Sequence, residues 1–105
     1  MSVWRRYEIF LPRRFNDGTP VPGDLFADTI IQLREQFGAV SADTQAIRGQ
    51  WQHQGEIFRD DSVHLFVDVA DTPKNRRYFV RLKEVLKQRF QQIDLWVTSY
   101  PIDVL

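Results

Sequence analysis

The sequence of 105 residues contains no cysteine, only one methionine, and five residues each of glycine and proline. Without cysteine the chain has no disulfide framework, thiol nucleophile, iron–sulfur cluster or cysteine-ligated zinc site. No apolar run is long enough to span a membrane, and the N-terminal segment lacks the apolar core of a signal peptide. We therefore expect a cytoplasmic protein with no membrane partner. The 14 basic and 14 acidic side chains cancel, which removes any global attraction to nucleic acid or acidic lipid.

The composition that remains is that of a soluble globular protein with an excess of aromatic residues. Hydrophobic residues make up 43% and charged residues 27% of the chain, and both values are ordinary. The length predicts one domain over residues 1–105, with a radius of gyration of roughly 13 Å. Aromatic residues reach 13%, with three Trp and eight Phe, and this is the one unusual feature of the composition.

The first half of the chain predicts a strand followed by a helix. Apolar and polar side chains alternate over Val3–Leu11, and Pro12 ends this strand. A loop rich in turn formers follows, and a helix is predicted from an N-cap at Asp24 to Phe37, with Gly38 as the left-handed residue after its end. The buried stripe of this helix has helical spacing and consists of Phe26, Ile30, Leu33 and Phe37.

Two further strands are predicted in the middle of the chain. They cover Thr44–Phe58 and Ser62–Ala70, with a turn at Arg59–Asp61 between them. Gly49 and Gly55 mark a bend, a bulge or a short extra hairpin in the first of these strands, so its register stays open.

The last part predicts a second helix and a final strand. Asp71, Thr72 and Pro73 supply a cap followed by proline at the first helical position, and the helix runs to about Gln92. The strand covers Ile93–Tyr100 and is closed by Pro101. The apolar face of the helix consists of Phe79, Leu82, Leu86 and Phe90.

The resulting order is β-α-β-β-α-β, which predicts an α+β fold. Two amphipathic helices and four half-apolar strands are most simply buried as a two-layer sandwich, with both helices on one face of a four-stranded antiparallel sheet. Right-handed crossovers then give the ferredoxin-like plait, in which the first and third strands are central.

Four segments spread over the chain resemble small bacterial conserved hypothetical proteins with a ferredoxin-like (α/β-plait) fold. They read YEIFLPRRFNDGTPVP at 7–22, GQW at 49–51, DVADTP at 68–73 and RFQQIDLWV at 89–97. None of them is a catalytic signature, and the resemblance implies the fold but no activity, cofactor or functional residue.

The strand pattern divides the sheet into a covered and an open face. The face beneath the helices is predicted to carry Tyr7, Ile9, Leu11, Val63, Leu65, Val67, Ile93, Leu95 and Val97. The open face then carries Trp4, Arg6, Glu8, Phe10, His64, Phe66, Asp68, Trp96, Thr98 and Tyr100, of which five are aromatic. Each aromatic side chain offers ~150–250 Å² of buriable area, so this face is a candidate ligand-binding or interface surface.

Two of three competing uses of the open face are self-association and nucleic-acid binding. Self-association packs two sheets face to face as a homodimer, with the charged residues pairing at the seam. A platform for single-stranded nucleic acid would use Phe10 and Phe66 as stackers, as RNA-binding plaits do. Glu8 and Asp68 on the same face would repel phosphates, and the third strand lacks the basic-Gly-aromatic signature. Nucleic acid is therefore the weaker expectation.

The third use is a small-molecule pocket of the kind found in dimeric α+β barrels, with His64 as its acid or base. Glu8 or Asp68 could orient the imidazole. Side chains four apart on one strand lie ~13 Å apart, so Asp68 is too distant and a partner on a neighbouring strand is required. The alternative for His64 is a structural role as a hydrogen-bonded residue. His64 is the one catalytic candidate in the sequence.

The neutral total charge hides a segregation. Residues 73–92 carry seven basic residues against Glu84 alone, a balance of +6, which leaves −6 for the rest of the chain. Arg77 and Arg81 on this helix, and Arg14 in the first loop, are therefore candidate anion-binding residues. The alternative for Arg77 and Arg81 is a helix surface that only contacts solvent, and the alternative for Arg14 is a structural role in its loop. Two scattered histidines make no recognisable metal motif.

From these features we expect a non-catalytic binding or regulatory module that homodimerises through its aromatic open sheet face. No cofactor is implied. A small ligand or a protein partner is compatible with the pattern, and catalysis at His64 is the alternative.

Overall fold

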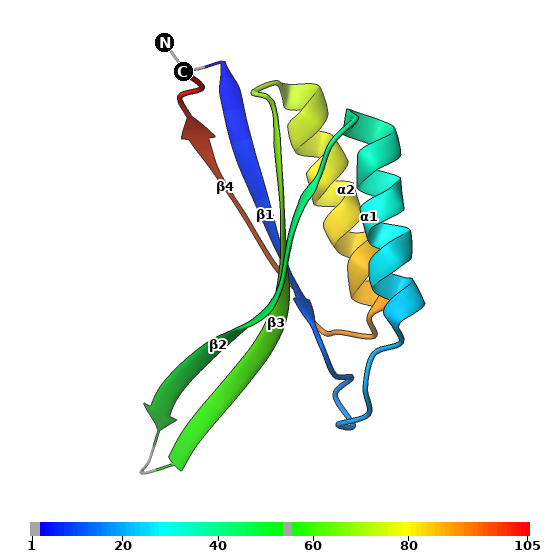
Figure 1. Cartoon of the computed structure of the whole chain (residues 1–105), viewed down its shortest axis with the longest axis vertical. Coiled ribbons are helices and arrows are strands. Elements are labelled where there is room, and N and C mark those ends of the chain that lie inside the picture. The colour runs from blue at the N-terminus through cyan, green and yellow to red at the C-terminus, as the bar shows by residue number, and fades with distance from the viewer. Residues whose placement is uncertain (1–2, 54–55) are drawn as a thin grey trace.

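The computed structural model describes residues 3–53 and 56–105, with side chains for 3–42 and 62–105. The elements are β1 (Trp4–Pro12), α1 (Gly23–Phe37), β2 (Ser41–His53), β3 (Glu56–Ala70), α2 (Pro73–Arg89) and β4 (Trp96–Ile102). The sheet has the order β2-β3-β1-β4, and every neighbouring pair is antiparallel. Both helices lie on one side of it (Figure 1). The predicted α+β plait, with its first and third strands central, is confirmed.

The core lies between the helices and the odd-numbered side chains of β1. Tyr7, Ile9 and Leu11 are buried, and the Tyr7 ring stacks on Phe79 of α2 with 3.9 Å between ring centroids. The predicted inner face of α2 is confirmed, because its four apolar residues are all buried: Phe79, Leu82, Leu86 and Phe90. In α1 the stripe is less deeply buried, and the fully buried positions are Leu33 and Thr29.

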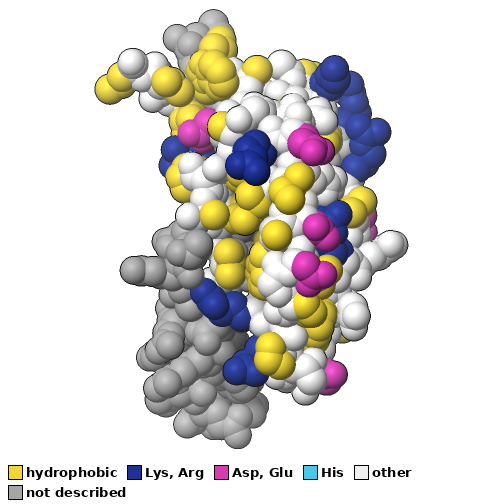
Figure 2. Space-filling model, turned by 45° about the vertical axis from the view of Figure 1, so that its right-hand side comes forward, with side chains coloured by type: hydrophobic (Ala, Val, Ile, Leu, Met, Phe, Trp, Pro, Cys, Tyr) yellow, Lys and Arg dark blue, Asp and Glu magenta, His cyan; other side chains and the backbone are white. Residues whose placement is uncertain are grey.

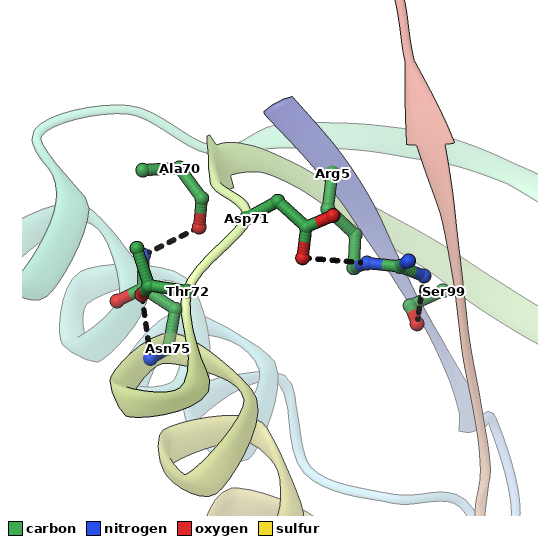
Figure 3. A network of polar contacts seen from close by, with 6 residues as sticks. All are labelled: Arg5, Ala70, Asp71, Thr72, Asn75 and Ser99. Carbon is green, nitrogen blue, oxygen red and sulfur yellow. Dashed lines mark hydrogen bonds and ion pairs between the residues drawn. The ribbon is translucent and has the colours of Figure 1, made fainter. Parts of the chain in front are cut away.

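Local signals fix two of the four helix ends. Thr72 caps α2 by accepting a hydrogen bond from the backbone N–H of Asn75 at 3.2 Å, and Pro73 opens the helix (Figure 3). Gly38 has φ 83°, and its N–H donates to the Arg34 carbonyl. These predictions are confirmed. The N-cap at Asp24 is wrong, because α1 begins at Gly23 after Pro22 and Asp24 lies in the first turn. An acidic side chain in the first turn interacts favourably with the positive end of the helix dipole, but it does not cap the helix.

The second helix and the last strand are shifted from their predicted bounds. Helix α2 ends at Arg89, and the chain turns before β4 begins at Trp96. Ile93 was expected beneath the helices, but it is 90% exposed in this connection, so that assignment is wrong. Strand β4 also continues through Pro101 to Ile102. Proline is tolerated there because β4 is an edge strand, which does not need every N–H for the ladder.

The turn predicted at Arg59–Asp61 is also wrong, because these residues lie inside β3 and pair with Arg48–Gln50 of β2. The ladder shifts register between Asp43 and Ile47, whereas Gly49 pairs regularly with Asp60. Gly55 lies outside the described residues. Before Ser62, β3 pairs with β2 alone, so the hydrophobic alternation that marks a sheet strand is not required there.

The pairing leaves a two-stranded ribbon that projects beyond the sheet (Figure 1). It comprises 48–53 of β2 and 56–61 of β3. The projection explains why the radius of gyration is 14.9 Å, above the roughly 13 Å expected for a compact chain of this length.

Candidate functional site

The open face of the sheet is built from cross-strand rows centred on β1. Each even-numbered residue of β1 from Trp4 to Phe10 has a partner on β3 and another on β4. The rows are Ala70–Trp4–Ile102, Asp68–Arg6–Tyr100, Phe66–Glu8–Thr98 and His64–Phe10–Trp96. The ten side chains assigned to the open face from the sequence pattern therefore lie on one face, in neighbouring positions. Side chains one row apart on the same strand are ~7 Å apart, so they can interact.

The upper part of this face holds a charge pair over an aromatic ring. Arg6 donates two hydrogen bonds to the Asp68 carboxylate, from Nε at 2.8 Å and from Nη2 at 3.1 Å. Its guanidinium also lies 4.4 Å from the centre of the Phe66 ring. The bond to Asp68 raises the pKa of Arg6 above its ordinary value. The bidentate geometry and the stacked ring hold this arginine in one place.

The lower part holds a second polar group around Glu8. The Tyr100 hydroxyl donates to Glu8 Oε1 at 2.8 Å, and His64 Nε2 lies 3.7 Å from Glu8 Oε2. The bond to the carboxylate raises the pKa of Tyr100, because ionised tyrosine would lose it. Glu8 is thus the cross-strand partner that the spacing of His64 and Asp68 required. His64 Nε2 itself has no hydrogen bond among the described residues.

Aromatic side chains fill the spaces between these polar groups. The His64 imidazole stacks on the Phe10 ring at 4.6 Å, with an angle of 5° between the rings. Trp96 is 68% exposed, and Trp4 and Tyr100 are each 41% exposed. The face is therefore an apolar surface in which the charged groups already contact one another.

A hollow of about 360 Å³ adjoins the last row of the face. Phe10 and Trp96 form part of its wall, and Ser62, Gln92 and Asp94 supply polar groups. His64 is not part of its lining. Nothing in the sequence pattern indicates this hollow, because it depends on where the chain turns between α2 and β4.

The three candidate anion-binding arginines do not form one site. Arg14 lies in the loop after β1 and donates to the Gly18 carbonyl at 3.0 Å, as a structural loop residue would. Arg77 and Arg81 lie together on α2, on the helix side of the sheet, around the exposed Val80. They are therefore separated from the open face by the whole thickness of the sheet. Where side chains are described, no group of three or more metal-ligating residues is found.

Comparisons with known proteins give information about the fold alone. No family model matches the chain, and no curated protein matches it. Neither helix in the described parts of the chain is long and apolar enough to cross a bilayer.

Three similar solved structures have the same architecture. The divalent cation tolerance protein CutA1 from Thermus thermophilus is 18% identical, with a TM-score of 0.61 over 94% of this chain and 84% of its own. A phage SAM lyase in complex with S-methyl-5′-thioadenosine is 18% identical, with a TM-score of 0.63 over 99% and 92%. CutA1 from Oryza sativa is 14% identical, with a TM-score of 0.59 over 98% and 84%. At these identities the likeness shows the fold alone, and that fold is the ferredoxin-like plait.

Proposed function

We propose that the chain is a single cytoplasmic domain that acts as a non-catalytic binding or regulatory module and homodimerises through its aromatic open sheet face. The observation that carries this proposal is the exposure of Trp96, Trp4 and Tyr100 on a face whose charged groups are already paired. Covering such a face buries apolar area without leaving charges unsatisfied.

Charge favours a second copy of the chain as the occupant. With His64 neutral, the face carries Arg6 against Glu8 and Asp68, a balance of −1. A nearly neutral face gains little from a strongly charged partner, and it meets little repulsion from its own copy. In a symmetric dimer both copies would contribute the same rows of residues, as an isologous interface requires.

The projecting ribbon gives a second reason for self-association. Two strands with no third neighbour are marginally stable in water, and the ribbon has none within the described chain. A partner sheet laid over the face at His64 would adjoin the place where the ribbon leaves the sheet.

The test is the mass of the particle in solution. Size-exclusion chromatography with light scattering is expected to give twice the 12.5 kDa chain mass, and Trp96→Gln is expected to shift the protein towards the monomer. Ile93→Gln is the matched control, because Ile93 is exposed and apolar but lies off the sheet face. A monomer at all concentrations, or equal effects of both variants, would refute the interface.

A second candidate function is small-molecule binding in the hollow at Phe10 and Trp96. Two aromatic rings and a few polar groups line this hollow, as in many small-molecule sites. The similar phage lyase holds S-methyl-5′-thioadenosine, so this nucleoside is a suitable probe. We expect it to quench tryptophan fluorescence of the native protein, and Trp96→Phe to remove the response. Unchanged fluorescence at millimolar nucleoside would exclude this use.

Catalysis at His64 and binding of single-stranded nucleic acid have weaker support. His64 has a carboxylate neighbour in Glu8, but the adjoining hollow does not reach it. For nucleic acid, the one arginine of the face is held by Asp68. Retention of a labelled single strand at low salt, weakened by Phe10→Ala and Phe66→Ala on the open face, would reinstate the nucleic-acid alternative.

A further inference from the structure

A groove of about 370 Å³ runs along the other side of the sheet, between α2 and the edge strand β4. Its apolar lining comes from Tyr7 and Val97 of the sheet and from Phe79 and Val80 of the helix. Val80 is 60% exposed, so this part of the apolar lining is open to solvent. Figure 2 turns the helices towards the viewer and shows hydrophobic side chains exposed among charged ones on this side.

The polar residues of the groove give it a positive balance. No side-chain hydrogen bond or ion pair of Arg76 is found among the described residues, and its charge acts on the neighbouring Tyr7 phenol, which also lines the groove. Lys83 pairs with Asp94 at 3.2 Å and holds the pKa of that carboxyl below its ordinary value. Glu84, the one acidic residue of the lining, pairs with Lys87 at 3.3 Å. The uncompensated charge of the groove is therefore that of Arg76.

The Arg76 end of the groove is held in place by a polar link between β1, β4 and the segment that leads into α2. Arg5 of β1 donates from Nε to Asp71 at 3.0 Å and from Nη1 to the Ser99 hydroxyl at 3.1 Å (Figure 3). Asp71 lies in the connection between β3 and α2, two residues before the helix begins at Pro73, and Ser99 lies in β4 and lines the groove. The link ties the strand to the helix start, so the groove is formed before any ligand arrives.

The dimensions define the ligand. Arg76 and Lys83 are seven residues apart on α2, which places them ~10 Å apart along the helix axis. We propose that this groove binds a small amphipathic anion, a carboxylate that carries a short alkyl chain or one aromatic ring. The carboxylate lies against Arg76, and the apolar body covers the exposed Val80 and the half-buried Val97. Inorganic anions would leave the apolar lining in water, so they bind less well.

This site does not depend on the proposed dimer. The groove lies on the helix side, and packing of two open faces leaves it exposed. Loss of dimerisation would therefore leave anion binding intact, and absence of anion binding would leave the dimer intact.

The experiment is a titration of the full chain with hexanoate, followed by amide chemical shifts. We expect the largest shifts at Val80, Val97 and Ser99, and at least several-fold weaker binding of hexanamide, which has the same body without the charge. Arg76→Gln is expected to weaken hexanoate binding about five-fold. Arg77→Gln is the matched control, because it removes the same charge from the next residue, which does not line the groove.

Three outcomes would overturn the proposal. One is equal binding of hexanoate and hexanamide. Another is an equal loss in Arg76→Gln and Arg77→Gln, which would indicate general attraction to a basic helix. The third is a set of shifts confined to the open face. Val80→Glu gives a further check, because the exposed position tolerates the change while the added carboxylate is expected to abolish hexanoate binding.

Discussion

The hydroxyl of Tyr7 is a polar atom buried in the core with no hydrogen-bond partner among the described residues. The ring is well placed, since it stacks on Phe79, and burial raises the pKa of the phenol. An unsatisfied buried hydroxyl costs free energy that the ring's packing must offset. The phenol therefore contributes to stability through its ring and not through its oxygen.

Tyr7→Phe is accordingly expected to raise the free energy of unfolding by about 1 kcal/mol, because it removes the unsatisfied oxygen and keeps the ring. Urea unfolding measures the change. Tyr78→Phe is the control: its hydroxyl interacts with Gln32, so the same deletion is expected to leave stability equal or lower. A clear loss of stability in Tyr7→Phe would show that the hydroxyl has a partner.

Tyr100 is expected to titrate above 10, the ordinary pKa of tyrosine, because only its protonated form donates to Glu8. Its contribution to stability is then complete below pH 10 and is lost as the pH rises through the higher folded-state pKa. Tyrosinate absorbance measures this, with Tyr100→Phe to assign the signal. In Glu8→Gln the pKa should fall, because Arg6 then favours the ionised form. An unchanged value would mean that the bond to Glu8 does not form in solution.

At the scale of elements, the connection from α2 to β4 offers a direct comparison of pattern and structure. Ile93 and Leu95 alternate in sequence as if both faced the core, but Ile93 is 90% exposed and Leu95 is 6% exposed. Ile93→Gln is expected to change the free energy of unfolding by less than about 0.5 kcal/mol. Leu95→Ala is expected to cost about 2–4 kcal/mol. The denaturant midpoints of the two variants measure these changes. A similar loss of stability in both would show that Ile93 also faces the core, as the sequence pattern predicted.

The elements that the sequence predicted well are those with a local cause. Thr72 and Pro73 determine where α2 begins, and Gly38 determines where α1 ends, whatever the rest of the chain does. The prediction of a turn at Arg59–Asp61 was wrong because three consecutive polar residues remain in a strand wherever the neighbouring strand still pairs with them. The extent of that ladder is a property of two strands together, and no single segment shows it.

The sequence predicted which residues lie on the open face, but it did not predict which of them contact one another. Alternation places Arg6, Glu8 and Asp68 on one face whichever strands are neighbours. The bond from Tyr100 to Glu8 depends on the register of β4 against β1, which shifts every pairing if it changes by one residue. The groove beside α2 was missed for the same reason, since it arises only where the helix and the edge strand meet.

At the scale of the whole molecule, the projecting ribbon connects stability to assembly. The amides of 56–61 have β2 as their one neighbouring strand, whereas those of Ser62–Ala70 lie between two strands over most of their length. Local opening should therefore be far more frequent in the ribbon than in the sheet of an isolated chain. A second copy laid over the open face reaches the root of the ribbon at His64, so assembly should reduce this opening.

Hydrogen exchange tests that coupling. Ribbon amides are expected to exchange quickly in dilute protein and more slowly as the concentration rises, while amides at the centre of β1 stay protected throughout. In Trp96→Gln the ribbon should exchange quickly at every concentration, because the interface is weakened without any change in the ribbon. Ile93→Gln should behave as the unmodified chain does. Ribbon exchange that ignores concentration would mean that the ribbon is stable alone, and the instability of a two-stranded projection would then no longer argue for self-association.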